Sequence, residues 1–261
     1  MVNKSEHVVV SMTSFPAAIN YAVGAIRSLL AGNALPDRLI LYVTLSQFGD
    51  EGLPTELKEL EKQNDIFEIR DYPVDIRSYR KLIPALSDFP DSIIVTVDDD
   101  VYYHPDMLGR LLKFHELFPD DIIAHRAKRI AIGKPYRKWR KFRWYHFINQ
   151  RIKRSTLNIQ TGVGGVLYPP GALCKEMMDA ELFTKLAPTA DDIWFWAAAV
   201  TNGRKILPVP FGFNKPKGLG KPRSLSLKTV NFKDGTDRNV ETLENIMEYF
   251  PEIRRNLEYG H

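Results

Sequence analysis

The chain has 261 residues, of which 44% are hydrophobic, enough for one large α/β domain with a substantial core. Its single cysteine, Cys174, excludes a disulfide framework and a cysteine-based zinc cluster, and it fits a reducing compartment. The net charge is only +4, no N-terminal segment resembles a signal peptide, and no apolar run is long enough to span a bilayer, so we expect a cytoplasmic protein.

Apolar runs and helical patterns alternate in the first half of the chain. We expect strands at residues 7–13, 38–44, 66–69 and 92–97, and helices at 17–31, 55–63, 78–86 and 105–118. Ser14 is placed to cap the first of these helices. Strands that alternate with helices, without internal repeats, indicate a mainly parallel sheet covered by helices on both faces.

The regular alternation of strands and helices ends after Asp120. We expect short strands at 122–125 and 129–132, a strand at 161–168, helices at 171–180, 190–201 and 240–249, and a Gly/Pro/Lys-rich loop at 211–223. Because no shift in composition marks a linker, the sequence predicts a single domain whose second half is elaborated.

Three consecutive aspartates, Asp98, Asp99 and Asp100, follow the apolar run at 92–97. In an open α/β sheet the carboxyl ends of the strands form the edge where ligands bind. Adjacent carboxylates repel one another, so such a cluster is stable when it is solvated or when a cation neutralises it. Oxygen ligands of this kind suit Mg²⁺ or Mn²⁺ bridging to a substrate diphosphate, and a solvated acidic turn is the alternative.

A second acidic pair, Asp191 and Asp192, stands at the start of the helix expected at 190–201. One interpretation is structural, with Thr189 or Asp191 capping the helix. The other is a general base whose pKa is tuned by desolvation, next to aromatic side chains that offer flat faces to an acceptor. These aromatic residues are Trp194, Phe195 and Trp196. A metal centre and a base together are more specific than either alone.

The glycine-rich segment 161–165 does not have the pattern of a phosphate-binding loop. It lacks the Gly-Lys-Ser/Thr of a P-loop, and no Gly-x-Gly-x-x-Gly follows the first strand, which argues against an NTPase and a nicotinamide-dependent dehydrogenase. Its glycines instead allow a substrate or another stretch of backbone to approach closely.

Five segments resemble, in the same order, those of bacterial glycosyltransferases of the GT-A fold from capsule and lipopolysaccharide synthesis. They are residues 10–16, 79–85, 94–100, 164–170 and 190–194, within a resemblance that spans about residues 8–215. It implies one GT-A domain over 1–261, with a nucleotide-binding half at 1–120 and an acceptor-binding half at 121–261. The implied reaction transfers a sugar from a nucleotide-sugar, with UDP-sugars favoured, to a glycan or lipid-linked glycan acceptor during surface polysaccharide synthesis.

The resemblance also implies a donor site. Asp98 and Asp100 match the Asp-x-Asp motif, which holds Mn²⁺ or Mg²⁺ on the donor diphosphate, and Asp98 and Asp99 lie where the donor nucleotide is met. Further donor contacts are expected from Ser11, Thr13 and Lys81, although for Lys81 an ordinary surface lysine is the alternative.

The base of an inverting enzyme is matched by Asp192, with Asp191 helping to hold the acceptor or to cap the helix. Members of this fold often take a further metal ligand, frequently His, after the base. Here no histidine lies between His146 and His261, which leaves that place open to Asn214, water or the diphosphate alone.

Three alternatives remain open at this point. A retaining transferase would use the carboxylate at Asp192 only to orient substrates. A sugar nucleotidyltransferase would need a Gly-rich loop with Arg or Lys after the first strand, where the chain has residues 13–16 instead. A non-catalytic module that binds glycan or lipid would show no donor hydrolysis.

Residues 134–154 form a basic segment interleaved with large aromatic residues. The cations are Arg137, Lys138, Arg140, Lys141, Arg143, Arg151, Lys153 and Arg154, and the aromatic residues are Trp139, Phe142, Trp144, Tyr145 and Phe147. Exposing so many aromatic side chains is costly, which indicates an interaction surface rather than a solvated helix. We expect peripheral contact with anionic lipid on the inner face of the cytoplasmic membrane. Single-stranded nucleic acid is the less favoured partner, because it would not require the two acidic centres.

The loop at 211–223 carries further cations, at Lys215, Lys217, Lys221 and Arg223. Such a loop could close on the nucleotide diphosphate and exclude water, or it could be an ordinary exposed loop.

Overall fold

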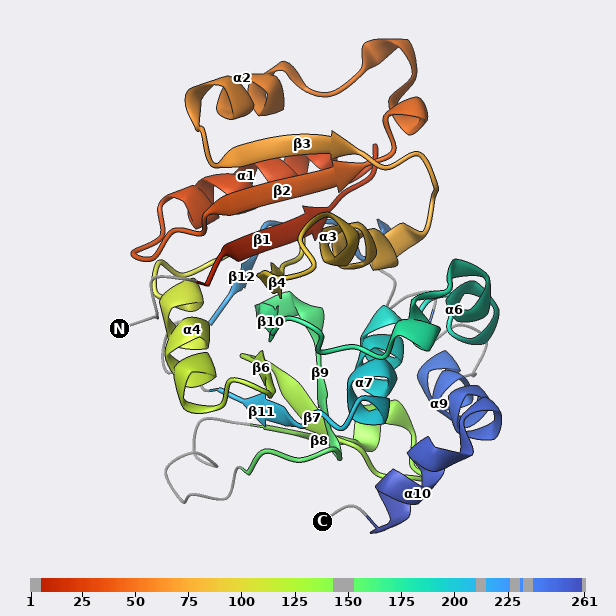
Figure 1. Ribbon diagram of the computed structural model, residues 1–261. Coiled ribbons are helices and arrows are strands. Elements are labelled where there is room, and N and C mark those ends of the chain that lie inside the picture. The colour runs from red at the N-terminus through yellow and green to blue at the C-terminus, as the bar shows by residue number, and fades with distance from the viewer. Residues whose placement is uncertain (1–5, 143–152, 210–214, 226–230, 232–236, 260–261) are drawn as a thin grey trace.

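The computed structural model describes residues 6–142, 153–209, 215–225, 231 and 237–259, and it has an α/β architecture (Figure 1). At its centre is a seven-stranded sheet in the order β11-β6-β10-β4-β1-β2-β3. These strands are β1 (Val8–Thr13), β2 (Arg38–Val43), β3 (Phe67–Asp71), β4 (Ile93–Thr96), β6 (Ile122–Ala124), β10 (Val166–Tyr168) and β11 (Ile206–Pro208). Strand β10 runs antiparallel to both of its neighbours, and the other adjacent pairs are parallel. The predicted mainly parallel sheet is therefore confirmed.

Alternating side chains of the central strands fill two separate cores, one on each face of the sheet, as the pleat of a strand requires. On β1, Val9 contributes to one core, while Val8 and Val10 contribute to the other. The first core packs beneath α3 (Ile83–Asp88), α6 (Ala180–Leu186), α7 (Asp191–Thr201), α9 (Arg238–Tyr249) and α10 (Pro251–Tyr259). The second packs beneath α1 (Ile19–Leu30), α2 (Thr55–Gln63) and α4 (Met107–Leu117). Burial on both faces explains the nearly continuous apolar runs of β1, β2 and β4.

Two small sheets and several 3₁₀ turns complete the described structure. One small sheet pairs β5 (Val101–Tyr102) with β12 (Lys217–Gly218), and the other has the order β8 (Arg140–Lys141), β7 (Ala127–Arg129), β9 (Asn158–Gln160). The 3₁₀ turns are η1 (Leu45–Glu51), η2 (Arg77–Lys81), η3 (Tyr136–Lys138), η4 (Gly162–Gly164), η5 (Lys175–Met178) and η6 (Arg223–Leu225). No helix in the described part of the chain is both long and apolar enough to cross a bilayer.

Several local predictions are corrected by the structure. The strand expected at 161–168 is the turn η4 followed by β10, because Gly165 takes a positive φ of 89° that ends the turn. The helix expected at 171–180 is wrong, since η5 and α6 occupy the region instead. The helix expected at 78–86 is split into η2 and α3, with Pro84 in the tolerated first turn of α3. Helix α10 was not expected.

Ser14 does not cap α1, contrary to the prediction. Ala18 is the N-cap residue, and none of the described side chains caps this helix. The Ser14 hydroxyl instead donates a hydrogen bond to Asp99 at 2.5 Å. The residue therefore connects the end of β1 to the aspartate triad.

Candidate active site

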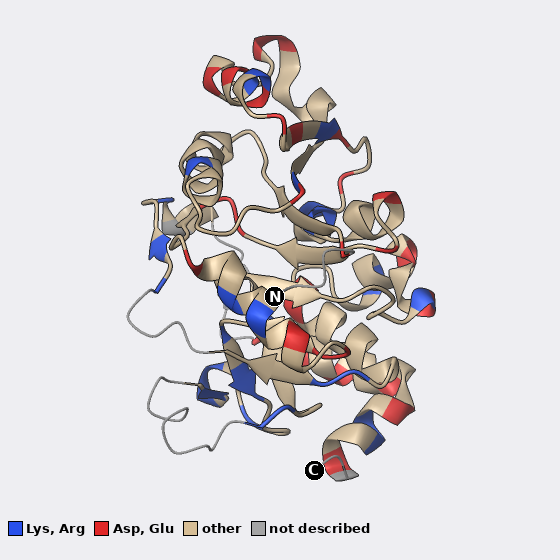
Figure 2. Cartoon of the chain, turned by 60° about the vertical axis from the view of Figure 1, so that its left-hand side comes forward, with Lys and Arg blue, Asp and Glu red and all other residues tan. Residues whose placement is uncertain are grey.

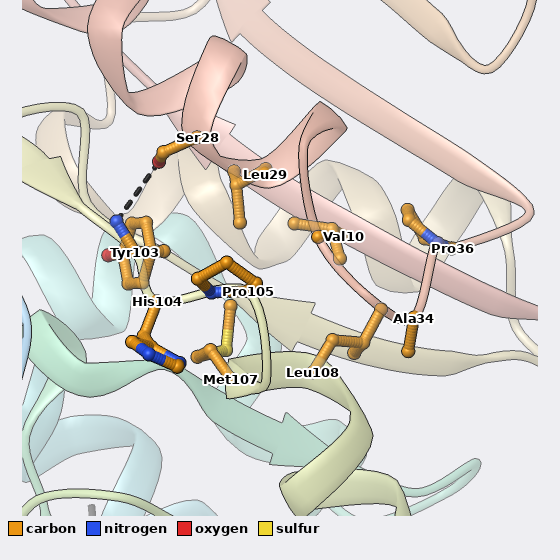
Figure 3. Close-up of a pocket in the computed structure, with 11 residues that line it drawn as sticks. Val10, Ser28, Leu29, Ala34, Pro36, Tyr103, His104, Pro105, Met107 and Leu108 are labelled. Atoms are coloured by element: carbon orange, nitrogen blue, oxygen red, sulfur yellow. Dashed lines mark hydrogen bonds between the residues drawn. The ribbon is translucent and has the colours of Figure 1, made fainter. Parts of the chain in front are cut away.

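The three aspartates Asp98, Asp99 and Asp100 lie in the turn that connects β4 to β5. The backbone N–H of Asp98 donates to the hydroxyl of Tyr103 at 2.8 Å. The N–H of Tyr103 in turn donates to the Ser28 hydroxyl at 3.0 Å, next to a small cavity between α1 and the segment that leads into α4 (Figure 3). This chain of hydrogen bonds fixes the triad to α1.

Two lysines form ion pairs with the triad. Lys221 Nζ lies 3.0 Å from Asp99 Oδ1 and 2.9 Å from Asp100 Oδ2, and Lys81 Nζ lies 3.3 Å from Asp98 Oδ1. Asp99 is buried, and burial raises its pKa in spite of the nearby Lys221 charge and the hydrogen bond from Ser14. Asp98 and Asp100 keep 29% and 27% of their side chains exposed, so a ligand can reach them.

The second acidic pair stands at the start of α7, as predicted, but neither carboxylate caps it. Ala190 is the N-cap residue, and no described side chain fills the capping role. Asp191 Oδ2 instead forms an ion pair with Lys81 Nζ at 3.0 Å. Both oxygens of Asp192 accept from the backbone N–H of Gly162, at 3.1 and 3.3 Å. Both carboxylates therefore contact residues outside α7 and do not cap their own helix.

Lys81 joins the two acidic centres. It is 6% exposed, which excludes the surface-lysine alternative, and it contacts both Asp98 and Asp191. Burial alone would lower the pKa of Lys81, but the charges of Asp191, Asp98 and Asp192 outweigh it and raise the pKa well above its ordinary value. Lys81 is therefore a charged, buried link between the two carboxylate groups.

Gly162 marks the place where the centres meet. A Cβ atom added to this glycine would lie 2.7 Å from Lys81 Nζ, 3.0 Å from Asp98 Oδ1 and 3.5 Å from Asp192 Oδ1. A side chain larger than hydrogen would thus collide with Lys81, crowd Asp98 and touch Asp192. The glycine segment was expected to allow a close approach, and here its backbone lies close to the acidic side chains.

Asp192 differs from the other acids because no described Lys or Arg forms an ion pair with it. Burial, followed by the negative charge of Asp191, raises the pKa of Asp192 to about 7. A carboxyl group that titrates near neutral pH can accept a proton from a hydroxyl group more readily than an ordinary Asp.

Of the residues expected to contact the donor, Ser11 and Thr13 lie in the second half of β1, and Lys81 is the last residue of η2. Ser11 is fully buried and donates to the backbone oxygen of Lys81 at 2.6 Å, which places it behind the site. Thr13 donates to the Tyr42 carbonyl at 2.9 Å and accepts from Arg80 Nε at 2.8 Å. Whether Ser11, Thr13 or Lys81 touches a donor stays a prediction.

Arg80 is a site residue that the sequence did not single out. Arg80 is 2% exposed, and its guanidinium also donates to the Ser14 carbonyl at 2.9 Å and to the Thr44 hydroxyl. It ties the ends of β1 and β2 together beneath Thr13. The only sequence signal was its position next to Lys81 within segment 79–85.

The aromatic residues of α7 do not offer stacking faces, contrary to the interpretation above. Trp194, Phe195 and Trp196 are completely buried. The indole nitrogens of the two tryptophans donate to backbone oxygens of Met177 and Thr156, at 2.7 and 2.8 Å. These side chains are core residues that anchor α7.

The described part of the basic segment is also less exposed than expected. Trp139 is 2% exposed and packs against Tyr136 with ring centroids 5.0 Å apart. The cations Arg140 and Lys141 on β8 are exposed, and Figure 2 shows Lys and Arg gathered around the strands in the lower part of the molecule. Phe142 is half-buried, with the Arg140 guanidinium 5.6 Å from its ring centroid. Residues 143–152, which include Trp144, Tyr145 and Phe147, lie outside the described residues.

The aspartate triad offers oxygen atoms to a divalent cation. Within the described residues no group of three His, Cys, Asp or Glu side chains could hold a metal ion by itself. Mg²⁺, however, commonly takes one or two carboxylates and completes its shell with substrate phosphates and water. Partly exposed Asp98 and Asp100 offer such oxygens, so the residues fit a cation shared with a diphosphate. Asn214, the possible further ligand, lies outside the described residues.

Comparisons with known proteins identify the fold. No protein-family model matches the sequence, and no curated protein matches it. Among solved structures, residues 1–349 of S. aureus TarS align with a TM-score of 0.53 and 12% identity, covering 96% of this chain and 74% of that one. The mannosyltransferase PcManGT from Pyrobaculum calidifontis, solved with GDP-Man and Mn²⁺, aligns with a TM-score of 0.55 and 12% identity, covering 98% and 74%. The chain therefore shares the α/β fold of a known sugar transferase over nearly its whole length.

Proposed function

We propose that the protein is a glycosyltransferase that moves a sugar from a nucleotide-sugar to a glycan or lipid-linked glycan acceptor. UDP-sugars are the favoured donors, and surface polysaccharide synthesis is the favoured setting. The similar mannosyltransferase holds GDP-Man and Mn²⁺, which supports this class of donor and cofactor. Residues 1–120 would supply most of the donor site and residues 121–261 most of the acceptor site.

One observation carries the proposal. Two acidic groups that are far apart in the sequence meet around Gly162, where Lys81 pairs with Asp98 from one group and with Asp191 from the other. A structural acidic turn and a helix cap would not need to face a common point. In a sugar transfer the leaving diphosphate and the attacking hydroxyl both act at one anomeric carbon, so the groups that handle them must lie around one common point.

In the proposed mechanism Asp192 removes the proton from the acceptor hydroxyl as the hydroxyl oxygen attacks the anomeric carbon, and the bond from that carbon to the nucleoside diphosphate breaks. The N–H of Gly162 orients the carboxylate, and the absence of an ion-paired cation among the described residues keeps its proton affinity high. In-line attack of this kind inverts the anomeric configuration. Lys81 holds Asp191 and Asp98 in place, so the spacing between base and donor site is maintained.

Asp98 and Asp100 would hold the divalent cation, either Mn²⁺ or Mg²⁺. When bound, the cation would supply charge neutralisation for the departing diphosphate. Thr13, fixed by Arg80, would contact the nucleotide at the carboxyl end of β1.

Peripheral contact with an anionic membrane through residues 134–154 is the second part of the proposal. The exposed cations of β8 support it. Trp139 is buried and packs against Tyr136, so these two aromatic side chains do not support membrane contact. Such contact would keep the enzyme near lipid-linked acceptors at the inner face of the membrane.

A donor-hydrolysis screen tests the proposal. The protein is incubated with a panel of nucleotide-sugars and Mn²⁺, and free nucleotide is measured with and without short glycan acceptors. We expect release from one donor class, with acceptor-dependent stimulation that Asp192→Asn removes. Binding of glycans without any nucleotide release would favour the non-catalytic module. Formation of nucleotide-sugar from a sugar 1-phosphate and a nucleoside triphosphate would favour the nucleotidyltransferase.

A further inference from the structure

Residues 217–221 form a strap that lies directly against the aspartate triad. Its strand β12 pairs with β5, which follows the triad in sequence, so that Gly218 is opposite Val101. The N–H of Leu219 donates to the backbone oxygen of Asp100 at 2.8 Å. The strap is therefore hydrogen-bonded to the same turn that carries the predicted metal ligands.

A side-chain contact anchors the strap to α1. Leu219 is partly buried against the core beneath α1, and its Cδ1 atom lies 3.0 Å from where a Cβ atom of Gly24 would be. The missing side chain at Gly24 leaves the space that Leu219 occupies. Backbone pairing on one side and this packing on the other fix the starting point of the Lys221 side chain.

The strap thereby places the Lys221 ammonium group against the triad. Lys221 bridges Asp99 and Asp100, and its side chain is only 13% exposed. The ammonium lies 6.0 Å from the centroid of the Phe15 ring. By contrast, Lys217 on the same strap is exposed. Lys221 therefore differs from Lys217 in its position against the triad, and not in the basic character of the segment.

We propose that Lys221 is a tethered counter-ion that competes with the divalent cation for Asp100 and passes to the donor diphosphate when the cation binds. The proposal rests on the proposed function, because it assigns a role to Lys221 at that same site. An ammonium group and a divalent cation repel each other strongly at the short distances that a shared carboxylate imposes. Lys221 must therefore leave Asp100 for the cation to bind there.

The donor itself supplies a reason for the exchange. A diphosphate brings oxygens that bind both a divalent cation and a lysine ammonium group. A lysine side chain has several rotatable bonds, so Lys221 can turn from Asp100 to a phosphate while the strap stays paired with β5. Cation and donor should consequently bind cooperatively, each weakly in the absence of the other.

Direct measurement of Mn²⁺ binding tests this without an activity assay. Free Mn²⁺ is titrated by electron paramagnetic resonance against wild type, Lys221→Met and Lys221→Arg, each with and without UDP. Lys221→Met should bind Mn²⁺ alone about tenfold more tightly, because the competing charge is gone. Lys221→Arg should stay close to wild type. UDP should strengthen Mn²⁺ binding more in wild type than in Lys221→Met.

Two controls separate the possible outcomes. Lys217→Met removes an exposed cation from the same strap and should leave Mn²⁺ affinity unchanged, and circular dichroism checks that every variant is folded. Equal Mn²⁺ affinity in wild type and Lys221→Met, with loss of binding in Asp100→Asn, would overturn the role of Lys221 while leaving the metal site intact. Binding by none of the proteins, even with UDP, would overturn both this role and the metal assignment, and donor hydrolysis would then test the transferase separately.

Discussion

The two acidic centres are built in opposite ways. The triad on the β4–β5 turn forms ion pairs with lysine side chains, whereas the Asp192 carboxylate at the start of α7 accepts from a backbone N–H and forms no ion pair with a described residue. A carboxylate that is paired with one cation can exchange it for another. A carboxylate that is desolvated without its own cation gains proton affinity. The contrast is consistent with the proposal that one centre binds the cation and the other accepts a proton.

The largest effect should come from removing the proposed metal ligand. Asp100→Ala should abolish transfer and Mn²⁺-dependent nucleotide binding, because the charge of the diphosphate is then left uncompensated. The fold should survive, since relief of repulsion among the three carboxylates offsets the lost contact with Lys221. Nucleotide binding by calorimetry with and without Mn²⁺ is the measurement. Unchanged turnover by a folded variant would remove the triad from the metal site.

The second prediction concerns Asp192, the proposed base. Asp192→Asn should retain donor and metal binding but lose transfer by roughly 10²–10⁴-fold. Because the buried carboxylate costs free energy when it is ionised, this variant should unfold at the same or a higher temperature than wild type above neutral pH. Steady-state kinetics and thermal unfolding together distinguish a base from a structural carboxylate.

Asp191→Asn is the matched control, since it lies on the same turn of α7 but pairs with Lys81. It should cost less in turnover than Asp192→Asn. If Asp191→Asn is the inactive variant instead, the two roles are exchanged. If both variants remain active and the product retains the anomeric configuration of the donor, the inverting mechanism is wrong.

The pH dependence of transfer sharpens the contrast further. Since the pKa of Asp192 is raised to about 7, the ionised base predominates only above that value. The rate at low substrate should therefore fall about tenfold per pH unit below it and level off above it. In the same range, folding stability attributable to Asp192 should decrease as pH rises, because the native state holds the proton more tightly than the unfolded chain. A rate that stays constant down to the ordinary range of aspartate would contradict the assignment.

The smallest effect on catalysis should come from the basic segment. Replacing Arg137, Lys138, Arg140 and Lys141 with Gln should release the protein from anionic vesicles, since each cation near such a surface contributes about 1 kcal/mol. Activity on a short soluble acceptor should be unchanged. Lys58→Gln with Lys62→Gln on α2 provides a control for general loss of charge. Unaltered vesicle binding by the fourfold variant would refute membrane contact through this segment.

The arrangement of the first half was largely predictable because it depends on local patterns. Helix α2 was predicted at its observed boundaries, and β1, β2, β4 and α4 within two residues of theirs. The errors arise where turns decide the structure. The region after β10 contains adjacent prolines and Gly171 with a positive φ of 61°, so its apolar residues do not form the helix that their spacing suggested.

The composition of the candidate site was predictable, but its ion pairs were not. Asp98, Asp100 and Asp192 could be singled out from strand ends and a helix start. The contact between Lys221 and Asp99 joins residues 122 positions apart, and nothing in the local sequence distinguishes Lys221 from Lys217. The burial of the aromatic residues was also not predictable from the sequence. Trp194 and Trp139 can be buried because backbone oxygens accept from their indole N–H groups.

The position of β10 has a consequence for how the chain acquires its structure during synthesis. This strand comes from the second half of the chain, yet it pairs with β4 on one side and with β6 on the other. Strands β1 to β4 leave the ribosome first, and the outer edge of β4 has no partner in the central sheet until residues 166–168 follow. An apolar strand with a free edge is prone to pair with another chain. We therefore expect nascent chains that stop before β10 to aggregate or to recruit chaperones, while chains that extend beyond it do so less.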